Sequence, residues 1–217
     1  SILFRGCSFM IMYEAGVWAA LQDLSPDILK SASKIYGASS GSIVAALGLC
    51  GCDTGKGSEM KQTLHDVVKN FYLPFLLGRK TMKILRESLQ KLLPPNAHQL
   101  VSGKLQVIIT RVRDCRSVAV SDFTSKEDLI QAITCSCFIP VCFGLVPPTY
   151  RGVYYVDGEI GMCRASLVSR CTITVSAFAG EYDICPRDSS AAFFNFLISD
   201  CILQISKNNF RRLLHIL

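Results

Sequence analysis

The stretch that decides the fold is Lys34-Ile35-Tyr36-Gly37-Ala38-Ser39-Ser40-Gly41, which continues without a charge to Cys50. Its first residues have the pattern of a short buried strand, and its middle is a turn of small residues. From Ser40 to Cys50 the residues are small or aliphatic on every side, which is typical of a helix that is buried all round. This strand, turn and helix predict an α/β core.

Strands and helices alternate along most of the chain around this unit. Because this alternation is typical of parallel sheets with helices on both faces, we expect a three-layer α/β/α fold with a mainly parallel central sheet. A capping box, Thr124 with Glu127, predicts the start of one helix. Strands are expected at Ile2–Phe4, Lys34–Tyr36, Leu105–Val112, Val118–Asp122, Val153–Val156 and Thr172–Ser176, and helices at Tyr13–Leu24, Ser25–Ser33, Ser40–Cys50, Ser58–Phe71, Lys80–Leu93 and Lys126–Cys135.

The composition suits one apolar α/β domain. The chain has 217 residues, of which 50% are hydrophobic and 18% are charged. We expect a single domain over residues 1–217, trimmed at both ends because the first residue already lies in an apolar, strand-like segment. A net charge of +6 without a block of Lys or Arg argues against nucleic acid as a partner, and fits an anionic membrane surface better.

Cysteine usage and hydropathy limit the cellular environments in which the chain is expected. Eleven cysteines, an odd number, and the lack of any Asn-x-Ser/Thr sequon predict a reducing, cytoplasmic location. The sequence has no CxxC pair, so buried thiols are favoured over a zinc site. Residues 35–52 and 129–150 are uncharged, but the first stretch begins with a Gly- and Ser-rich turn and the second contains three prolines. Neither is expected to span a membrane.

The pattern Gly37-x-Ser39-x-Gly41 is that of a nucleophile elbow, in which a serine occupies a strained turn between a strand and a helix. Such a turn needs small neighbours, and Ala38 and Ser40 meet that need. The helix that follows would direct backbone N–H groups at a developing oxyanion. GxSxG also occurs by chance in loops of small residues, but the strand before it and the apolar helix after it favour Ser39 as a nucleophile.

A serine hydroxyl needs a base to accept its proton. Asp157 follows an expected strand and precedes Gly158, which places a carboxylate at the end of a strand, although Asp-Gly is also a common turn dipeptide. His215 would give the chain order Ser, Asp, His of α/β-hydrolases, but it lies in a basic amphipathic segment near the chain end. His98 lies in an expected loop and is no better placed. The sequence favours a dyad of Ser39 and Asp157.

The segment Phe4-Arg5-Gly6-Cys7-Ser8-Phe9 is a second source of oxyanion donors. It joins the first strand to the first long helix, and the small residues Gly6, Cys7 and Ser8 would allow backbone N–H groups to face a substrate. The simplest alternative is an ordinary tight turn.

Six segments also carry a family resemblance: RGCSFMIMYEAGV, IYGASSGS, SGKLQVIITRVRD, FTSKEDLIQA, CSCFIPVCFGLVPPTYRGVYYVDG and TITVSAFAGEYDICPRD. Together they resemble the patatin-like phospholipase domain family over nearly the whole chain, in the animal branch of adipose triglyceride lipase and ω-hydroxyceramide transacylase. The resemblance implies a patatin fold, a catalytic dyad of Ser39 and Asp157, an oxyanion hole on Gly6 to Ser8, and no metal or organic cofactor.

Three positions depart from the family pattern. Ser8 and Ile11 stand where the family has glycines, and Glu159 replaces the glycine that follows Asp157-Gly158. A side chain at Ser8 costs about 1 kcal/mol or more if the backbone there has φ > 0. A negative charge on Glu159 would raise the pKa of Asp157 and repel a negative transition state. These departures predict weakened or redirected activity.

Two functions therefore stay open. The first is a lipid acyl hydrolase or transacylase, acting on triacylglycerol, phospholipid or related lipid esters through an acyl-enzyme on Ser39. The second is a catalytically weakened regulator that binds a lipid droplet or membrane surface. In both cases we expect a cytoplasmic protein attached peripherally to that surface, with a protein co-activator as a further partner. A nucleotide-binding function is disfavoured because the sequence contains neither a GxGxxG nor a P-loop pattern.

Overall fold

The computed structural model describes residues 1–51, 81–162, 171–188, 195–198 and 201–214. The predicted helix Ser58–Phe71 and His215 lie outside these residues. The strands are β1 (Ile2–Phe4), β2 (Ile35–Ala38), β3 (Leu105–Arg111), β4 (Arg116–Val120), β5 (Thr149–Tyr150), β6 (Val153–Val156), β7 (Ile173–Val175), β8 (Asn195–Ile198) and β9 (Cys201–Gln204). The helices are the 3-10 turn η1 (Ser8–Met10), α1 (Ile11–Leu24), α2 (Pro26–Ser31), α3 (Ser40–Leu49), α5 (Thr81–Leu92), α6 (Ala97–Val101), α7 (Lys126–Ser136), α8 (Gly158–Met162) and α9 (Lys207–Leu214).

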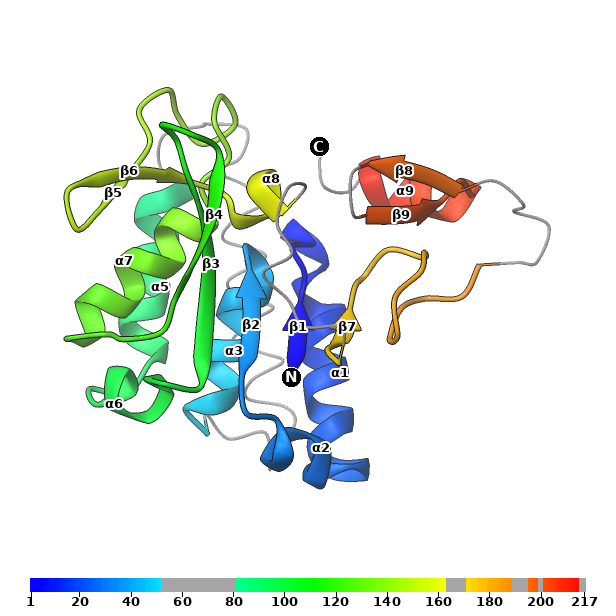
Figure 1. Ribbon diagram of the computed structural model, residues 1–217, viewed down its shortest axis with the longest axis horizontal. Helices are drawn as coiled ribbons and strands as arrows, with labels where there is room; N and C mark the ends of the chain where they lie inside the picture. Colours follow the sequence, from blue (N-terminus) through cyan, green and yellow to red (C-terminus); the bar gives the residue numbers. More distant parts are fainter. Residues whose placement is uncertain (52–80, 163–170, 189–194, 199–200, 215–217) are drawn as a thin grey trace.

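A seven-stranded sheet has the order β5-β6-β3-β2-β1-β7, with β4 also paired to β3 (Figure 1). Strands β7, β1, β2 and β3 are parallel, which confirms the predicted parallel centre. Strands β4 and β6 both pair with β3 in the antiparallel sense, and β5 pairs with β6 in the same way. The parallel centre brings the carboxyl ends of β1 and β2 to one end of the sheet.

The main core lies between one face of the sheet and the helices α1, α3, α5 and α7. Phe4 from β1 packs against Trp18 from α1, with their ring centroids 5.5 Å apart. Helix α3 is buried from Ser40 to Gly48, as its uniformly small and aliphatic sequence predicts. The opposite face carries a smaller buried cluster around Ile108. Helix α8 packs on that face, so it provides the third layer among the described residues.

The predicted capping box at the start of α7 is wrong by one residue. The cap is Ser125, whose hydroxyl accepts the Asp128 N–H at 3.0 Å. The Asp128 carboxylate reaches back to the Thr124 N–H at 3.0 Å. Asp128 therefore takes the reciprocal part expected of Glu127, because its shorter side chain bonds within the same turn.

The hairpin β8–β9 and helix α9 lie beyond β7 (Figure 1). Asn209 on α9 accepts the Ala179 N–H at 2.9 Å and donates to the Ala179 carbonyl oxygen at 2.6 Å. Arg212 forms an ion pair of 2.8 Å with Asp188, whose side chain is 2% exposed. These contacts connect α9 to the segment that follows β7.

Candidate active site

Ser39 joins β2 to α3 with φ 52° and ψ −128°, a conformation that non-glycine residues rarely adopt. The glycines around it are required by close packing. A β-carbon on Gly41 would lie 2.3 Å from the Phe4 carbonyl oxygen, and one on Gly37 would lie 2.5 Å from the Ser42 α-carbon. The turn therefore has the geometry that a nucleophile elbow requires.

The Ser39 hydroxyl donates a hydrogen bond of 2.6 Å to Asp157 Oδ2. Both residues are buried, with exposed fractions of 8% and 3%. The sequence places Asp157 after a strand, but β6 runs antiparallel to β3 and so approaches Ser39 from the opposite direction. The Asp157 backbone is held by its N–H bond to the Phe138 carbonyl oxygen at 2.9 Å and by the Thr110 hydroxyl, which donates to its carbonyl oxygen at 2.7 Å.

Burial raises the pKa of Asp157 to about 7, because the ionised carboxylate has lost its water. The hydrogen bonds from the Ser39 hydroxyl and from the Glu159 N–H lower this pKa, and the negative charge of Glu159 raises it. The predicted effect of the Glu159 charge has the correct sign, but burial is the larger cause.

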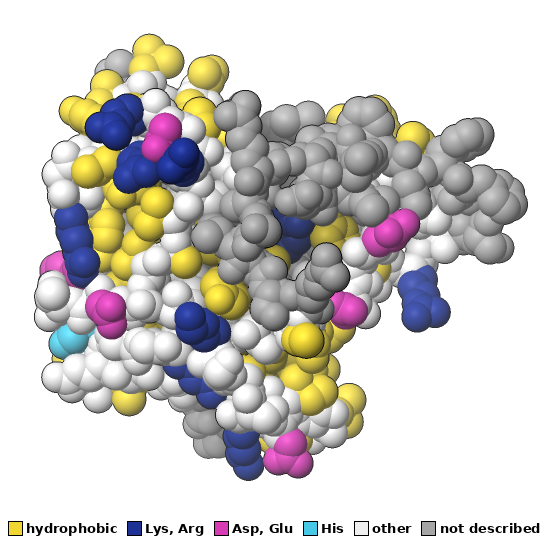
Figure 2. All heavy atoms as spheres, in the orientation of Figure 1, with side chains coloured by type: hydrophobic (Ala, Val, Ile, Leu, Met, Phe, Trp, Pro, Cys, Tyr) yellow, Lys and Arg dark blue, Asp and Glu magenta, His cyan; other side chains and the backbone are white. Residues whose placement is uncertain are grey.

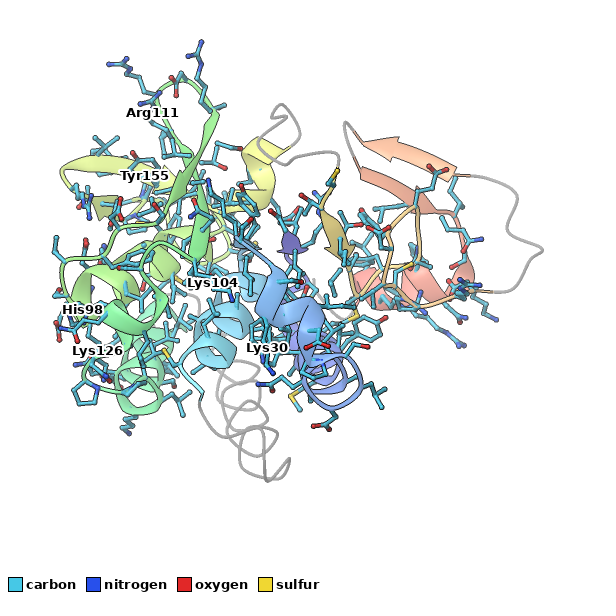
Figure 3. The ribbon with its side chains drawn as sticks, turned by 60° about the horizontal axis from the view of Figure 1, so that its bottom comes forward. Lys30, His98, Lys104, Arg111, Lys126 and Tyr155 are labelled. Atoms are coloured by element: carbon cyan, nitrogen blue, oxygen red, sulfur yellow. The ribbon has the colours of Figure 1, made fainter. Side chains whose placement is uncertain are left out.

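The structure does not bring His98 to Ser39. His98 lies on α6, which leads into the beginning of β3, whereas Ser39 follows the end of the parallel strand β2. Figure 1 shows α6 at the end of the sheet away from α8, and Figure 3 labels His98. Asp157 is therefore the candidate base that contacts the serine among the described residues.

Ser136 is a residue of the site that sequence analysis missed. Its hydroxyl accepts the Ser39 N–H at 2.8 Å and donates to the Ile108 carbonyl oxygen at 2.6 Å. It therefore connects the end of α7, the middle of β3 and the elbow. Its sequence signal is a polar residue near the buried end of α7, which does not reveal a partner 97 residues away.

The turn from Gly6 to Ser8, predicted to bind the oxyanion, leads from β1 to α1, and side chains hold two of its N–H groups. The Gly6 N–H donates to Glu159 Oε1 at 2.6 Å, and the Cys7 N–H donates to Ser40 Oγ at 2.9 Å. Ser8 has φ 49°, which meets the condition under which a side chain at this position is costly. The turn therefore carries the backbone strain predicted for a residue other than glycine.

A small apolar pocket of about 50 Å³ opens beside Ser39. Its walls come from η1, α1, α3, α5 and the segment that follows α7, so elements distant in sequence enclose it. The pocket is lined by Ser8, Phe9, Ile11, Ser39, Ser40, Ile43, Leu85, Cys137, Ile139 and Phe143. Ile11, which stands in place of a family glycine, is thus part of the pocket wall.

The Patatin-like phospholipase family model matches residues 2–162. The chain belongs to the patatin-like phospholipase family. Human ω-hydroxyceramide transacylase is 41% identical over 218 residues, covering 100% of this chain and 41% of that protein. A human 1-acylglycerol-3-phosphate O-acyltransferase is 39% identical, and the match covers 96% of this chain and 44% of that protein. Human patatin-like phospholipase domain-containing protein 2 is 39% identical, and the match covers 98% of this chain and 42% of that protein.

This patatin-like chain spans less than half the length of these relatives. None of its helices, within the part of the chain that the structure describes, combines the length and apolar character needed to cross a bilayer. The same residues contain no cluster of His, Cys, Asp and Glu that could bind a metal ion.

Two buried thiols flank the site of this family member. Cys7 lies on the oxyanion turn and Cys137 lines the pocket, and burial raises the pKa of each thiol well above its ordinary value. Both are therefore protonated at neutral pH and are poor nucleophiles. Ser39 therefore stays the candidate nucleophile of the site.

Proposed function

We propose that the chain is a serine acyl hydrolase or transacylase that acts on lipid esters. The observation that carries this proposal is the 2.6 Å hydrogen bond from the Ser39 hydroxyl to Asp157, made from a strained turn beside an apolar pocket. Family membership supports it, and two of the relatives above are named as a transacylase and an acyltransferase.

In the first step, Ser39 Oγ attacks the ester carbonyl carbon while its proton passes to Asp157 Oδ2. The carbonyl π electrons move to oxygen and give a tetrahedral oxyanion, which backbone N–H groups stabilise. The intermediate collapses, the bond to the alcohol oxygen breaks, and the alcohol leaves with the proton held by Asp157. The product is an acyl ester on Ser39.

In the second step, Asp157 accepts a proton from the acceptor that attacks this acyl ester. Water gives a free fatty acid, and a lipid alcohol gives a new ester. A base with a pKa of about 7 suits both half-reactions, since it takes up and releases a proton near neutral pH.

A lipid substrate is supported by the surface around the pocket mouth. Residues 138–148 contain no charged residue, and Val141, Leu145 and Val146 are 80%, 82% and 76% exposed. Figure 2 shows hydrophobic side chains beside Lys and Arg side chains at the top of the molecule, where the β3–β4 turn lies in Figure 1. We propose that this apolar loop contacts a droplet or membrane surface, because the same segment also lines the pocket.

Covalent labelling tests the enzyme function. A fluorophosphonate should modify the wild-type protein at Ser39, and Ser39→Ala should show neither labelling nor ester hydrolysis. Folded wild-type protein that is not labelled, together with hydrolysis that persists in Ser39→Ala, would contradict the proposal.

Liposome flotation tests the proposed membrane contact of residues 138–148. The vesicles are phosphatidylcholine with about 20% anionic phosphatidylserine. Leu145→Ser should lower the partition coefficient about tenfold, because an exposed leucine no longer enters the lipid. Leu24→Ser is the matched control, since Leu24 is also 82% exposed but lies at the end of α1. Equal binding of both variants and wild type would exclude residues 138–148 as the contact.

A second candidate function is a lipid-surface regulator with weakened catalysis. The observation that favours it is the Glu159 carboxylate on the Gly6 N–H, together with the strained Ser8. This function predicts vesicle binding without turnover. Wild-type esterase activity that Asp157→Asn abolishes would count against it.

A further inference from the structure

The carboxylate of Glu159 lies at the reacting centre, yet no step of the proposed reaction uses it. Its Oε1 accepts the Gly6 N–H at 2.6 Å. A β-carbon built on Gly6 would lie 2.6 Å from Glu159 Cγ and 2.9 Å from Ser39 Cβ. The Glu159 side chain therefore occupies the space between the oxyanion turn and the nucleophile.

A carboxylate oxygen at this position resembles the oxyanion of a tetrahedral intermediate. Both are negatively charged oxygens that accept a short, charge-assisted hydrogen bond from a backbone N–H. The Gly6 N–H has a single proton directed at this site. Glu159 and a substrate carbonyl oxygen therefore compete for the same donor.

Arg5 fixes the carboxylate in place. Its Nε and its terminal nitrogen donate to Glu159 Oε2 at 3.2 and 2.7 Å, and the Arg5 residue is 6% exposed. The guanidinium also lies over the Tyr182 ring, 5.7 Å from its centroid. Because a buried ion pair that loses one partner leaves an uncompensated charge, moving Glu159 away is costly.

We propose that Glu159 is an internal ligand of the oxyanion site, which a substrate carbonyl has to displace before Ser39 is acylated. This inference rests on the proposed acyl-transfer function and specifies how that site is controlled. The resting chain is held in a state of low reactivity by its own carboxylate.

The backbone and the side chain of Glu159 have opposite effects. The Glu159 N–H donates to Asp157 Oδ1 at 2.9 Å and so supports the base, whereas the side chain occupies the oxyanion donor. Truncation of the side chain keeps the supporting N–H. The two effects can therefore be separated by substitution.

The test is the second-order rate constant for fluorophosphonate labelling at Ser39, since the phosphoryl oxygen needs the same donor. Glu159→Gly and Glu159→Ala should each increase this constant by about 10- to 100-fold, in line with the value of one oxyanion donor. Glu159→Gln should fall between wild type and these variants, because its amide has one uncharged oxygen to serve both the Gly6 N–H and Arg5, where the carboxylate has two. Glu87→Gln, on the exposed face of α5, is the matched control and should leave the constant unchanged.

The outcomes separate this inference from the proposed function. If all Glu159 variants label at the wild-type rate, or more slowly, Glu159 is not an internal ligand of the oxyanion site. That outcome leaves the proposed role of Ser39 as nucleophile intact. No labelling in any folded variant would overturn both. If thermal melting shows that Gly and Ala at position 159 unfold the chain by removing the carboxylate that accepts from Arg5, the Gln variant decides, because its one amide oxygen can stay on Arg5 while the Gly6 N–H loses its carboxylate partner.

Discussion

The site has two halves that differ in how ready they are for catalysis. On one side, Ser39 and Asp157 are already in hydrogen-bond contact at 2.6 Å, and Ser136 holds the Ser39 N–H. On the other side, the oxyanion turn is strained at Ser8, and its Gly6 N–H is held by a carboxylate. The proposed nucleophile and base are thus in contact, while a donor of the proposed oxyanion turn is occupied.

This difference shows that two halves of one centre can be altered independently. The dyad depends on the strand-to-helix turn after β2 and on the end of β6, whereas the turn between β1 and α1 supplies the donors. A single side chain, Glu159, reaches from the first half into the second. The following predictions test whether the halves are as separate as the contacts indicate.

The largest expected effect is in the dyad. Asp157→Asn should lower kcat about 10³- to 10⁴-fold, because asparagine cannot accept the serine proton. The measurement is hydrolysis of a short-chain ester, with thermal melting to verify folding. Asp23→Asn, an exposed carboxylate at the end of α1, is the control and should leave kcat unchanged. A loss below about tenfold in Asp157→Asn would mean that Asp157 is not the base.

The pH dependence follows from the pKa of Asp157, which is about 7. Only the ionised carboxylate accepts a proton, so kcat/KM should rise with pH, about tenfold per unit below 7, and level off above it. The contribution of Asp157 to the free energy of unfolding has the opposite pH dependence. Because the folded-state pKa is raised from 3.8 to about 7, the contribution of Asp157 is present at low pH and is lost as the pH rises through this window. The range from pH 5 to pH 8 covers about three units around this pKa. A kcat/KM that is flat over this range contradicts the assignment of Asp157 as the base.

A smaller effect is expected at Ser136. Ser136→Ala should reduce the free energy of unfolding by about 1–3 kcal/mol, because the buried Ser39 N–H and Ile108 carbonyl lose their shared partner. Thr134→Val in the same helix removes a hydroxyl that bonds only to the Ile130 carbonyl, so its effect should be smaller. Urea denaturation measures both. Equal losses would show that Ser136 has no special part in holding the elbow.

The smallest effect is expected in the turn. Ser8→Gly should increase the free energy of unfolding by about 0.5–1 kcal/mol, since glycine adopts the φ of 49° without strain. Ser8→Ala keeps the β-carbon and should give no gain. If alanine stabilises as much as glycine, the backbone of the turn is not the origin of the strain.

Local patterns were sufficient to predict the elbow, the buried helix and the parallel strands. Gly37, Ser39 and Gly41 are close in sequence, and the apolar run after them has the period of a buried helix, so neighbouring residues carry the information. Asp157 was predicted as the base because it follows a strand and precedes Gly158, a signal that is also local. Its approach to Ser39 from an antiparallel strand was not foreseen, because strand direction depends on pairing between distant segments.

The features of the site that were missed are all contacts between distant residues. Ser136 lies 97 positions from Ser39, and the carboxylate of Glu159 lies 153 positions from the Gly6 N–H it accepts. The sequence indicated that Glu159 adds negative charge near the base. It could not show that the side chain bonds to the turn, because that depends on Arg5 facing the same space.

The two protonated thiols beside the nucleophile have a consequence for selective chemistry. Cys7 and Cys137 are within the site but closed to water, whereas Cys115 and Cys171 are exposed. Maleimides and oxidants should therefore react at the exposed cysteines and leave the centre untouched, while serine-directed phosphonates react only at the centre. A single sample can carry a fluorophore on one class of residue and an inhibitor on the other, so occupancy of the active centre can be read optically without altering it.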